Sequence, residues 1–282
     1  HKVTGYSTMT DYFTPKGGLP SQNIMHTGRA IFKEAYVFIP KGVITDIVSS
    51  RFPNWLNTRA WVLAKPMSGF AQTFSQYIME VSPKGGSVEP DPEPNAESIL
   101  FVTDGELDLE LNGVTHKMSE GGYAYVSSES KWKIFNKYKK TVSFHWIRKY
   151  YERVDGIDVP GSFVTNEKEI LPGGLTSDQT DGIWSTTQFV DPNDLSHDCH
   201  VNIVNFEPGG VIPFEETHVM EHGLYVLEGK AVYRLNEDWI EVEAGDFMWL
   251  RSFCPQACYA GGPGRFRYLL YKDVNRHPQL KL

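Results

Sequence analysis

The sequence predicts an all-β protein made of two similar barrels or jelly rolls in tandem. Two observations support this prediction: short segments alternate apolar with polar residues, and the chain contains an internal repeat. No segment shows a long 3.6-residue apolar period, which would indicate an amphipathic helix. Antiparallel sheets that close around an apolar interior are typical of such sequences.

The repeat relates residues 105–136 to residues 229–260. Each copy begins with Gly, continues with a strand-like run and a turn that contains Asn, and then has two further strands separated by a Gly turn. The runs LDLELNG and AVYRLNE alternate as half-buried strands do. The runs YAYV and FMWL, later in each copy, are rich in the aromatic and bulky apolar residues of strands. We expect one domain over residues 1–153 and a second over residues 154–282, which starts with a Gly- and Pro-containing connection to about residue 200.

Composition excludes several functional classes. The net charge of -8 argues against a nucleic-acid surface, which needs clustered Lys and Arg. The basic run from Lys131 to Lys140 is interpreted as a solvated hairpin edge. The sequence contains no run of about 18 apolar residues, so no membrane span is predicted. Three cysteines give no disulfide framework, so the cytoplasm is the expected compartment. The first residues lack a signal-peptide core, although a leader or tag could have preceded His1.

The strongest chemical signal is a set of four candidate metal ligands in the second half: Glu216, His218, His222 and Gln256. Glu216 and His218 are two residues apart, so on a strand both side chains point to one face. His222, at the start of the next strand, and Gln256, on a third strand, can converge on the same centre. Two imidazoles, one carboxylate and one amide oxygen form a mixed nitrogen and oxygen set.

This ligand set predicts one divalent ion per chain. With four protein ligands, an octahedral ion keeps two positions open, whereas a tetrahedral structural zinc keeps none. We therefore favour Mn²⁺, with Fe²⁺ or another divalent metal as the alternative.

The spacing of these residues resembles the two motifs of the cupin family. The gaps from Gly210 through the first three ligands to Gly229 match the first motif, and the gap from Gly245 to Gln256 matches the second. The identities are permuted, with Glu-His-His in place of His-His-Glu and Gln in place of the last His. The resemblance implies two tandem cupin domains, a bicupin.

The first half keeps the cupin spacing but not the ligands. The four equivalent positions hold Pro92, Pro94, Ser98 and Lys133. None of these can replace imidazoles around a cation. We therefore expect the N-terminal domain to lack a metal and to contribute packing or assembly.

Two other groups of residues look reactive. The run His197, Asp198, Cys199 and His200 contains metal-binding residue types, but no matching partner is recognisable elsewhere, so a second metal site is not predicted. Cys254 and Cys258 lie near Gln256 and are expected to be packing residues and not a redox pair.

The runs at residues 216–235, 236–249 and 267–278 resemble a narrower family, the (S)-ureidoglycine aminohydrolases. These are bicupins of purine and allantoin breakdown, also described in bacteria as glyoxylate-induced proteins. The resemblance implies manganese-dependent conversion of (S)-ureidoglycine, a small ureide, to (S)-ureidoglycolate and ammonia. It implies the same four metal ligands, catalytic roles that include Glu216, and substrate contacts by Tyr233, Tyr268 and Lys272.

The residues themselves support part of this assignment. Tyr268 and Lys272 are four apart in the run RYLLYK, so they share one face of a strand. Buried phenols and a lysine that extends to solvent are the simpler alternative for Tyr233, Tyr268 and Lys272.

Two alternative functions stay open. One is another metal cupin enzyme, a dioxygenase or a sugar-acid isomerase, and the other is a non-catalytic small-molecule-binding bicupin. Glu as the first ligand and Gln as the fourth depart from the usual dioxygenase set. Exposed strand edges and a barrel without ligands favour a homo-oligomer.

Overall fold

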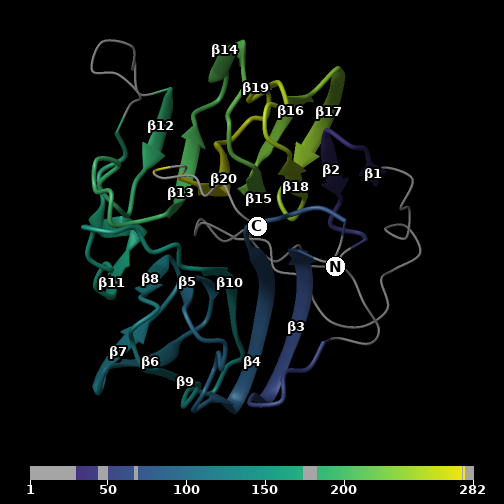
Figure 1. Cartoon of the computed structure of the whole chain (residues 1–282). Coiled ribbons are helices and arrows are strands. Elements are labelled where there is room, and N and C mark those ends of the chain that lie inside the picture. The colour runs from purple at the N-terminus through teal and green to yellow at the C-terminus, as the bar shows by residue number, and fades with distance from the viewer. Residues whose placement is uncertain (1–29, 44–49, 67–68, 174–182, 275, 277–282) are drawn as a thin grey trace, which may run out of the picture.

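The computed structural model describes residues 30–43, 50–66, 69–173, 183–274 and 276. Regular structure in this part of the chain is almost entirely β, which confirms the predicted fold class (Figure 1). The first ten strands are β1 (Ile31–Phe32), β2 (Tyr36–Ile39), β3 (Leu56–Ala64), β4 (Ser75–Ser87), β5 (Ala96–Asp104), β6 (Leu107–Leu111), β7 (Val114–Met118), β8 (Gly122–Val126), β9 (Trp132–Phe135) and β10 (Val142–Tyr150). The others are β11 (Phe163–Asn166), β12 (Trp184–Thr187), β13 (Cys199–Phe206), β14 (Val211–Glu216), β15 (His222–Glu228), β16 (Lys230–Leu235), β17 (Asp238–Glu243), β18 (Phe247–Leu250), β19 (Gln256–Tyr259) and β20 (Phe266–Asp273), with a short 3₁₀ helix, η3 (Glu167–Glu169), after β11.

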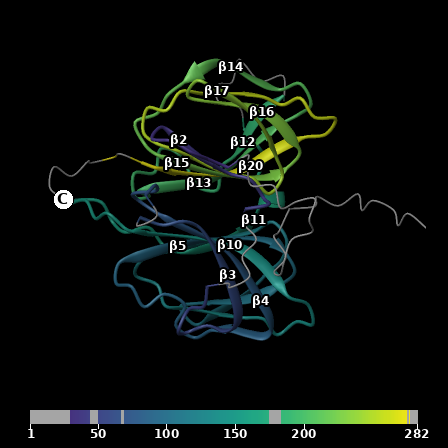
Figure 2. The same cartoon turned by 90° about the vertical axis from the view of Figure 1, so that its right-hand side faces the viewer.

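The strands form two barrels stacked on each other (Figures 1 and 2). The N-terminal barrel is a nine-stranded sheet in the order β11-β8-β5-β10-β4-β9-β6-β7, with β3 paired to β4. The C-terminal barrel combines a seven-stranded sheet, β1-β2-β18-β15-β20-β13-β12, with a four-stranded sheet, β14-β19-β16-β17. Neighbouring strands in the described pairings are antiparallel, as the alternation in the sequence predicts. No helix in the described ranges is long and apolar enough to cross a membrane.

Three apolar clusters hold the barrels together. One fills the N-terminal barrel, a second fills the C-terminal barrel, and a third lies between the barrels and takes residues from both. In the third cluster, Phe74 stacks on Tyr271 and Tyr123 stacks on Phe189, each at 3.9 Å between ring centroids. A fully buried large apolar side chain contributes about 1.5–3 kcal/mol. The shared cluster therefore makes each barrel a support for the other.

Strand pairing crosses the domain boundary expected at residues 153 and 154. Strands β1 and β2 precede the N-terminal barrel in the chain, but β2 pairs with β18 in the C-terminal barrel. Strand β11 follows the expected boundary, yet it pairs with β8 of the N-terminal barrel. Each exchanged segment covers the edge of a strand that would otherwise expose unpaired backbone groups. Alternation predicts strands but does not identify their partners, so the exchange was not visible in the sequence.

The internal repeat has a clear physical basis. Gly105 and Gly229, at equivalent positions, both have φ of 81°. A Cβ atom on Gly229 would lie 1.9 Å from the Arg265 carbonyl oxygen, and one on Gly105 would lie 2.7 Å from that of Thr141. Asn112 and Asn236 both adopt the left-handed conformation that Asn tolerates in tight turns.

Candidate metal centre

Glu216 and Gln256 lie opposite each other on neighbouring strands of the C-terminal barrel. Glu216 ends β14, Gln256 begins β19, and the two residues are direct partners in the antiparallel register. Opposed residues project from the same face with Cβ atoms about 4.5–5.5 Å apart. The register of β14 shifts between Ile212 and Glu216. Such irregularities re-aim side chains, and this one brings the carboxylate beside the amide.

The two predicted imidazole ligands follow directly in the chain. His218 Nε2 lies 3.6 Å from Glu216 Oε2. The rings of His218 and His222 have centroids 4.7 Å apart. Among the described residues, however, the donor atoms of Glu216, His218 and His222 are not all gathered within 4.8 Å of one another. The structure therefore places these side chains side by side without bringing the three donors to one point.

One pair in this donor set has a spacing that suits two ligands of the same divalent ion. Ligand atoms bound to one ion at about 2.2 Å lie about 3.1–3.6 Å apart, and the 3.6 Å between Glu216 and His218 falls at the end of that range. The assignment of Glu216, His218, His222 and Gln256 as the four ligands stays a prediction.

His222 is held in the form that binds metals. Burial and the nearby His218 and Lys272 lower the pKa of His222 to about 3, so its imidazole is neutral at neutral pH. His222 Nδ1 lies 3.2 Å from the Met220 carbonyl oxygen. When Nδ1 donates to this carbonyl, the lone pair of Nε2 is left for a ligand, an arrangement common in metal sites.

Two buried tyrosines connect to Gln256. The hydroxyl of Tyr233, on β16, donates to Gln256 Oε1 at 2.7 Å and lies 3.4 Å from the hydroxyl of Tyr268, on β20. Burial raises the pKa of both phenols well above the ordinary value. Both hydroxyls are therefore neutral and able to donate hydrogen bonds. The structure brings together Gln256, Tyr233 and Tyr268, as expected for one site.

Lys272 lies in the same region of the barrel. On β20 it is the direct partner of His222 on β15. Lys272, Leu270 and Tyr268 share the parity of the inner face, where Tyr268 and Leu270 join the core of the C-terminal barrel. Burial lowers the pKa of Lys272, and the charge of Glu216 opposes this shift. The predicted inward direction of Lys272 agrees with this register.

The sequence interpretation missed a residue of this region, His200. In the sequence it stands in a run with His197, Asp198 and Cys199 for which no second metal site is predicted, but β13 begins at Cys199. His200 is the direct partner of Lys272 on the side away from His222. The alternation in HVNIVNF would have placed His200 and Asn202 on one face. That alternation does not reveal, however, that His200 lies beside Lys272, because the partner of the strand is not visible in the sequence.

Asp198 and Cys199 face the space between the barrels. Cys199 Sγ donates to Glu97 Oε1 at 3.3 Å, and Lys149 Nζ donates to Asp198 Oδ2 at 2.8 Å. The donor atoms of Glu97, Asp198 and Cys199 lie within 4.8 Å of one another. Burial and the nearby Asp198 raise the pKa of Glu97 well above its ordinary range. The Lys149 ammonium supplies a positive charge to this cluster, and the absence of a second metal there stays a prediction.

The equivalent region of the N-terminal barrel is filled by indole rings. The Trp146 Nε1 donates to Ser98 Oγ at 2.9 Å, and the Trp132 ring lies 6.0 Å from that of Trp146. The assignment of Lys133 to the fourth ligand position was wrong. Trp132 pairs with Leu111 as Gln256 pairs with Leu235, whereas Lys133 faces outward. Gly121, and not Gly122, is the equivalent of Gly245, because both have a positive φ and donate their backbone N–H to the equivalent carbonyls of Val102 and Val226. Counting from Gly122 therefore shifted the equivalence by one.

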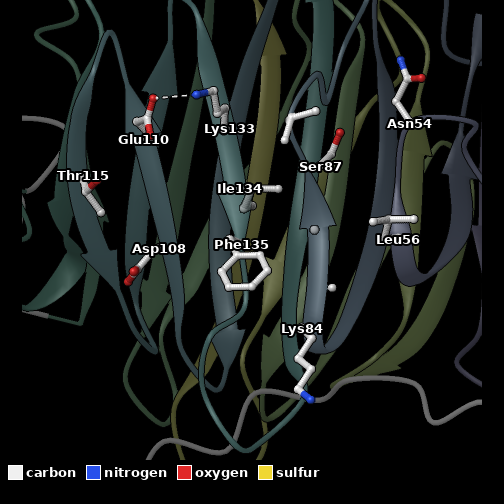
Figure 3. A pocket seen from close by; sticks show the side chains of 13 residues that line it. Asn54, Leu56, Lys84, Ser87, Asp108, Glu110, Thr115, Lys133, Ile134 and Phe135 are labelled. Carbon is white, nitrogen blue, oxygen red and sulfur yellow. Dashed lines mark ion pairs between the residues drawn. The ribbon is translucent and has the colours of Figure 1, made fainter.

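Lys133 instead borders a pocket of about 370 Å³ on the outer face of the N-terminal barrel (Figure 3). It forms an ion pair with Glu110 at 3.1 Å. Phe135, Leu56 and Val88 line the same pocket and are exposed. The pocket is therefore a mixed apolar and paired-charge surface outside both barrels and separate from the candidate metal centre.

Comparisons with known proteins agree with this architecture. Residues 77–148 and 202–271 match the model of the cupin domain. The chain is 31% identical over 254 residues to a probable (S)-ureidoglycine aminohydrolase of Oryza sativa subsp. japonica, covering 89% of this chain and 76% of the rice protein. It is 29% identical to the (S)-ureidoglycine aminohydrolase of Escherichia coli K12, covering 89% of this chain and 94% of that protein.

A solved structure is closer in sequence. The crystal structure of the "putative glyoxylate induced protein" of Pseudomonas aeruginosa is 62% identical, with a TM-score of 0.90 over 97% of this chain and 100% of that one. The two cupin segments, the rice relative and this structure together show that the chain is a bicupin that belongs to the (S)-ureidoglycine aminohydrolase family.

Proposed function

We propose that this chain hydrolyses (S)-ureidoglycine to (S)-ureidoglycolate and ammonia in ureide breakdown, with Mn²⁺ as its metal. The observation that carries the proposal is the register of Glu216 with Gln256, beside a buried chain of hydroxyls from Tyr233 and Tyr268. These are the residue types that the family's site would need, and they come from four strands, β14, β19, β16 and β20. Family membership supplies the substrate class.

The residues fit a hard or borderline divalent ion with open positions. Carboxylate and amide oxygens suit Mn²⁺, and two neutral imidazoles suit Mn²⁺ or Fe²⁺. When bound, the ion supplies Lewis acidity and a template for the substrate's amine and carboxylate. We propose one such ion per chain.

The charged and hydroxyl groups near the metal ligands would bind the substrate and move protons. We propose that the Lys272 ammonium pairs with the substrate carboxylate, and its register with His222 on the inner face supports this role. The lowered pKa of Lys272 also makes it a better proton carrier near neutral pH. Tyr233 orients the Gln256 amide and, with Tyr268, can donate a hydrogen bond to substrate. The Glu216 carboxylate stabilises the positive charge of Lys272 and so limits the lowering of its pKa by burial.

The assay that tests the proposal is ammonia release from freshly generated (S)-ureidoglycine by manganese-loaded protein. We expect release well above an enzyme-free blank and loss of release after chelation. A dioxygenase or a sugar-acid isomerase would neither consume this substrate nor produce ammonia. A non-catalytic bicupin would bind the substrate without turnover. Either result would overturn the proposed reaction.

We further propose a cytoplasmic homo-oligomer. Cys199, Cys254 and Cys258 are free thiols, which are typical of a reducing compartment. The exposed apolar side chains Leu56, Val88 and Phe135 on the outer face of the N-terminal barrel offer a surface for a second copy. Light scattering of the purified protein tests this, because a monomer at micromolar concentration would contradict it.

A further inference from the structure

Strand β20 runs between β13 and β15, and Lys272 has a direct partner on each side. His200 is its partner on β13, and His222 is its partner on β15. Opposed residues project from the same face of a sheet. Four residues further along β13, on the same face of the sheet, the row contains Val204, Tyr268 and Val226. These three residues belong to the core of the C-terminal barrel. His200, Lys272 and His222 therefore form one row on the inner wall of this barrel.

His200 is buried without a complete set of partners. His200 is only 6% exposed, and its Nε2 atom has no hydrogen-bond partner in the described part of the chain. A buried polar atom left without a partner costs about 1–3 kcal/mol. Buried nitrogens are therefore nearly always paired. A bound small molecule is a partner that would remove this cost.

Asn202 is the next inward-facing residue of β13. It is 5% exposed and lies opposite Leu270, which in turn pairs with Leu224. A primary amide beside leucines in the wall of a barrel contributes little to packing, because its two N–H donors and its oxygen need polar partners. Its position beside His200 places a second polar group at the same end of the wall.

We propose that His200 and Asn202 form the part of the substrate pocket that recognises the ureido group. This inference rests on the proposed function, and it adds two residues that would determine substrate specificity. We call His200 and Asn202 together the ureido wall. The carboxylate and amine of the substrate lie on the Glu216 and His222 side of Lys272, and the ureido group extends to the other side. Two strand spacings of about 4.8 Å each separate β13 from β15, so side chains on these two strands can contact the two ends of a short linear substrate.

The chemistry of the two groups is complementary. Burial and the positive charge of Lys272 lower the pKa of His200 to about 4, so its imidazole is neutral near pH 7. A neutral imidazole has one N–H donor and one acceptor nitrogen, and an amide has both functions as well. A ureido group offers a carbonyl acceptor and several N–H donors. Glycine, which carries the same amine and carboxylate, offers nothing to this wall.

A binding experiment separates the two ends of the substrate. N-carbamoylglycine carries the carboxylate and ureido group but lacks the amine that leaves, so it is not hydrolysed by this reaction. Its affinity for manganese-loaded protein is measured by calorimetry beside that of glycine. We expect His200→Leu and Asn202→Leu each to weaken N-carbamoylglycine about tenfold or more. Glycine should stay within about twofold.

Two further variants control the result. In His200→Gln the amide can occupy the place of Nε2, so we expect part of the N-carbamoylglycine affinity to return. His145→Gln replaces an equally buried imidazole that packs on Tyr225 outside the pocket, and it should leave both affinities unchanged. The inference is wrong if wild-type protein does not bind N-carbamoylglycine, or if His200→Leu weakens both ligands equally.

The outcome is independent of the outcome for the reaction. Protein that binds N-carbamoylglycine through His200 but releases no ammonia would keep the ureido wall and contradict the proposed hydrolysis. Protein that releases ammonia with an unchanged KM in both leucine variants would keep the hydrolysis and contradict the wall.

Discussion

The Glu221 carboxylate accepts a hydrogen bond from the backbone N–H of Thr73 at 2.6 Å, across the boundary between the two barrels. It also accepts from the Thr73 hydroxyl at 2.7 Å, from the Gln72 backbone N–H at 2.8 Å, and from Trp249 Nε1 at 2.7 Å. Glu221 directly precedes His222. The segment that follows β3 therefore holds the end of the loop that carries His218 and leads into His222 at the start of β15.

This contact predicts a linked loss of stability and metal affinity in Glu221→Gln. A glutamine has one acceptor oxygen, and its NH₂ group would face an N–H or O–H donor in place of the second carboxylate oxygen. We expect a loss of about 1–3 kcal/mol in the free energy of unfolding and several-fold weaker Mn²⁺ binding. Urea denaturation and manganese titration measure the two effects.

Glu215→Gln is the matched control for Glu221→Gln. Glu215 also neighbours a predicted ligand, but it is exposed and pairs with Arg234 at the surface. Exposed ion pairs contribute about 0–1 kcal/mol, so both measurements should stay near wild type. Equal effects of the two substitutions would show that the contact across the barrels does not position the metal loop.

Buried His145 predicts a loss of stability as the pH falls. Burial lowers its pKa to about 3, and its ring lies 4.2 Å from that of Tyr225 between the barrels. Its folded-state pKa is below its unfolded value of about 6.5. The unfolded chain therefore binds the extra proton first, and stability that is present above pH 6.5 is lost between pH 6.5 and 3.

The size of this effect can be measured by comparison. Between pH 7 and pH 5, one such histidine costs about 2 kcal/mol of the free energy of unfolding. His145→Gln removes this titration, so the loss of stability over the same interval should be smaller by about that amount. Parallel pH dependences in the two proteins would mean that His145 is protonated in the folded state.

The site is predicted from sequence only as far as local spacing reaches. The separation of Glu216 and His218 and the parity of Tyr268 and Lys272 are properties of a single segment, so alternation and motif gaps reveal them. The pairing of β13 with β20 joins residues far apart in the chain, and without it His200 looked like part of a polar run. For the same reason, the pairing of β2 with β18 was not predicted.

The error at Lys133 has a different cause. In a strand, a shift of one residue moves a side chain to the opposite face. The glycine that corresponds to Gly245 is Gly121, so a count from Gly122 reached an outward lysine in place of Trp132. The repeat of residues 105–136 at residues 229–260 already aligns Trp132 with Gln256, and the register of β6 with β9 agrees with that alignment.

Substitution of the imidazoles tests the predicted metal set. We expect close to one transition-metal ion per chain in the wild type, and loss of both metal and ammonia release in His218→Ala and His222→Ala. Pro94→Ala, at the equivalent spacing in the N-terminal barrel, should change neither. Elemental analysis of the purified proteins measures the stoichiometry. Full metal content in His222→Ala would remove that residue from the set, and two ions per chain would contradict a metal-free N-terminal barrel.

Lys272→Met tests whether the lysine on the inner wall acts on substrate. The side chain is partly buried between His200 and His222, and burial lowers its pKa. Methionine keeps most of the stem volume and removes the charge, so the variant should fold and retain Mn²⁺. A lost charge-assisted contact costs about 1.5–3 kcal/mol, which corresponds to a loss of at least about tenfold in kcat/KM.

The division of that loss between kcat and KM identifies the role of Lys272. Simple pairing with the substrate carboxylate is uniform binding, so its loss should appear mainly in KM. A lysine that also moves a proton should lose about a hundredfold or more, mainly in kcat. Because the lowered pKa brings deprotonation of Lys272 closer to neutral pH, the proton-transfer role also predicts an alkaline or neutral limb in the wild-type pH profile that Lys272→Met lacks. A well-folded variant with wild-type kinetics at every pH would leave Lys272 as a residue that packs its stem and extends its charge to solvent.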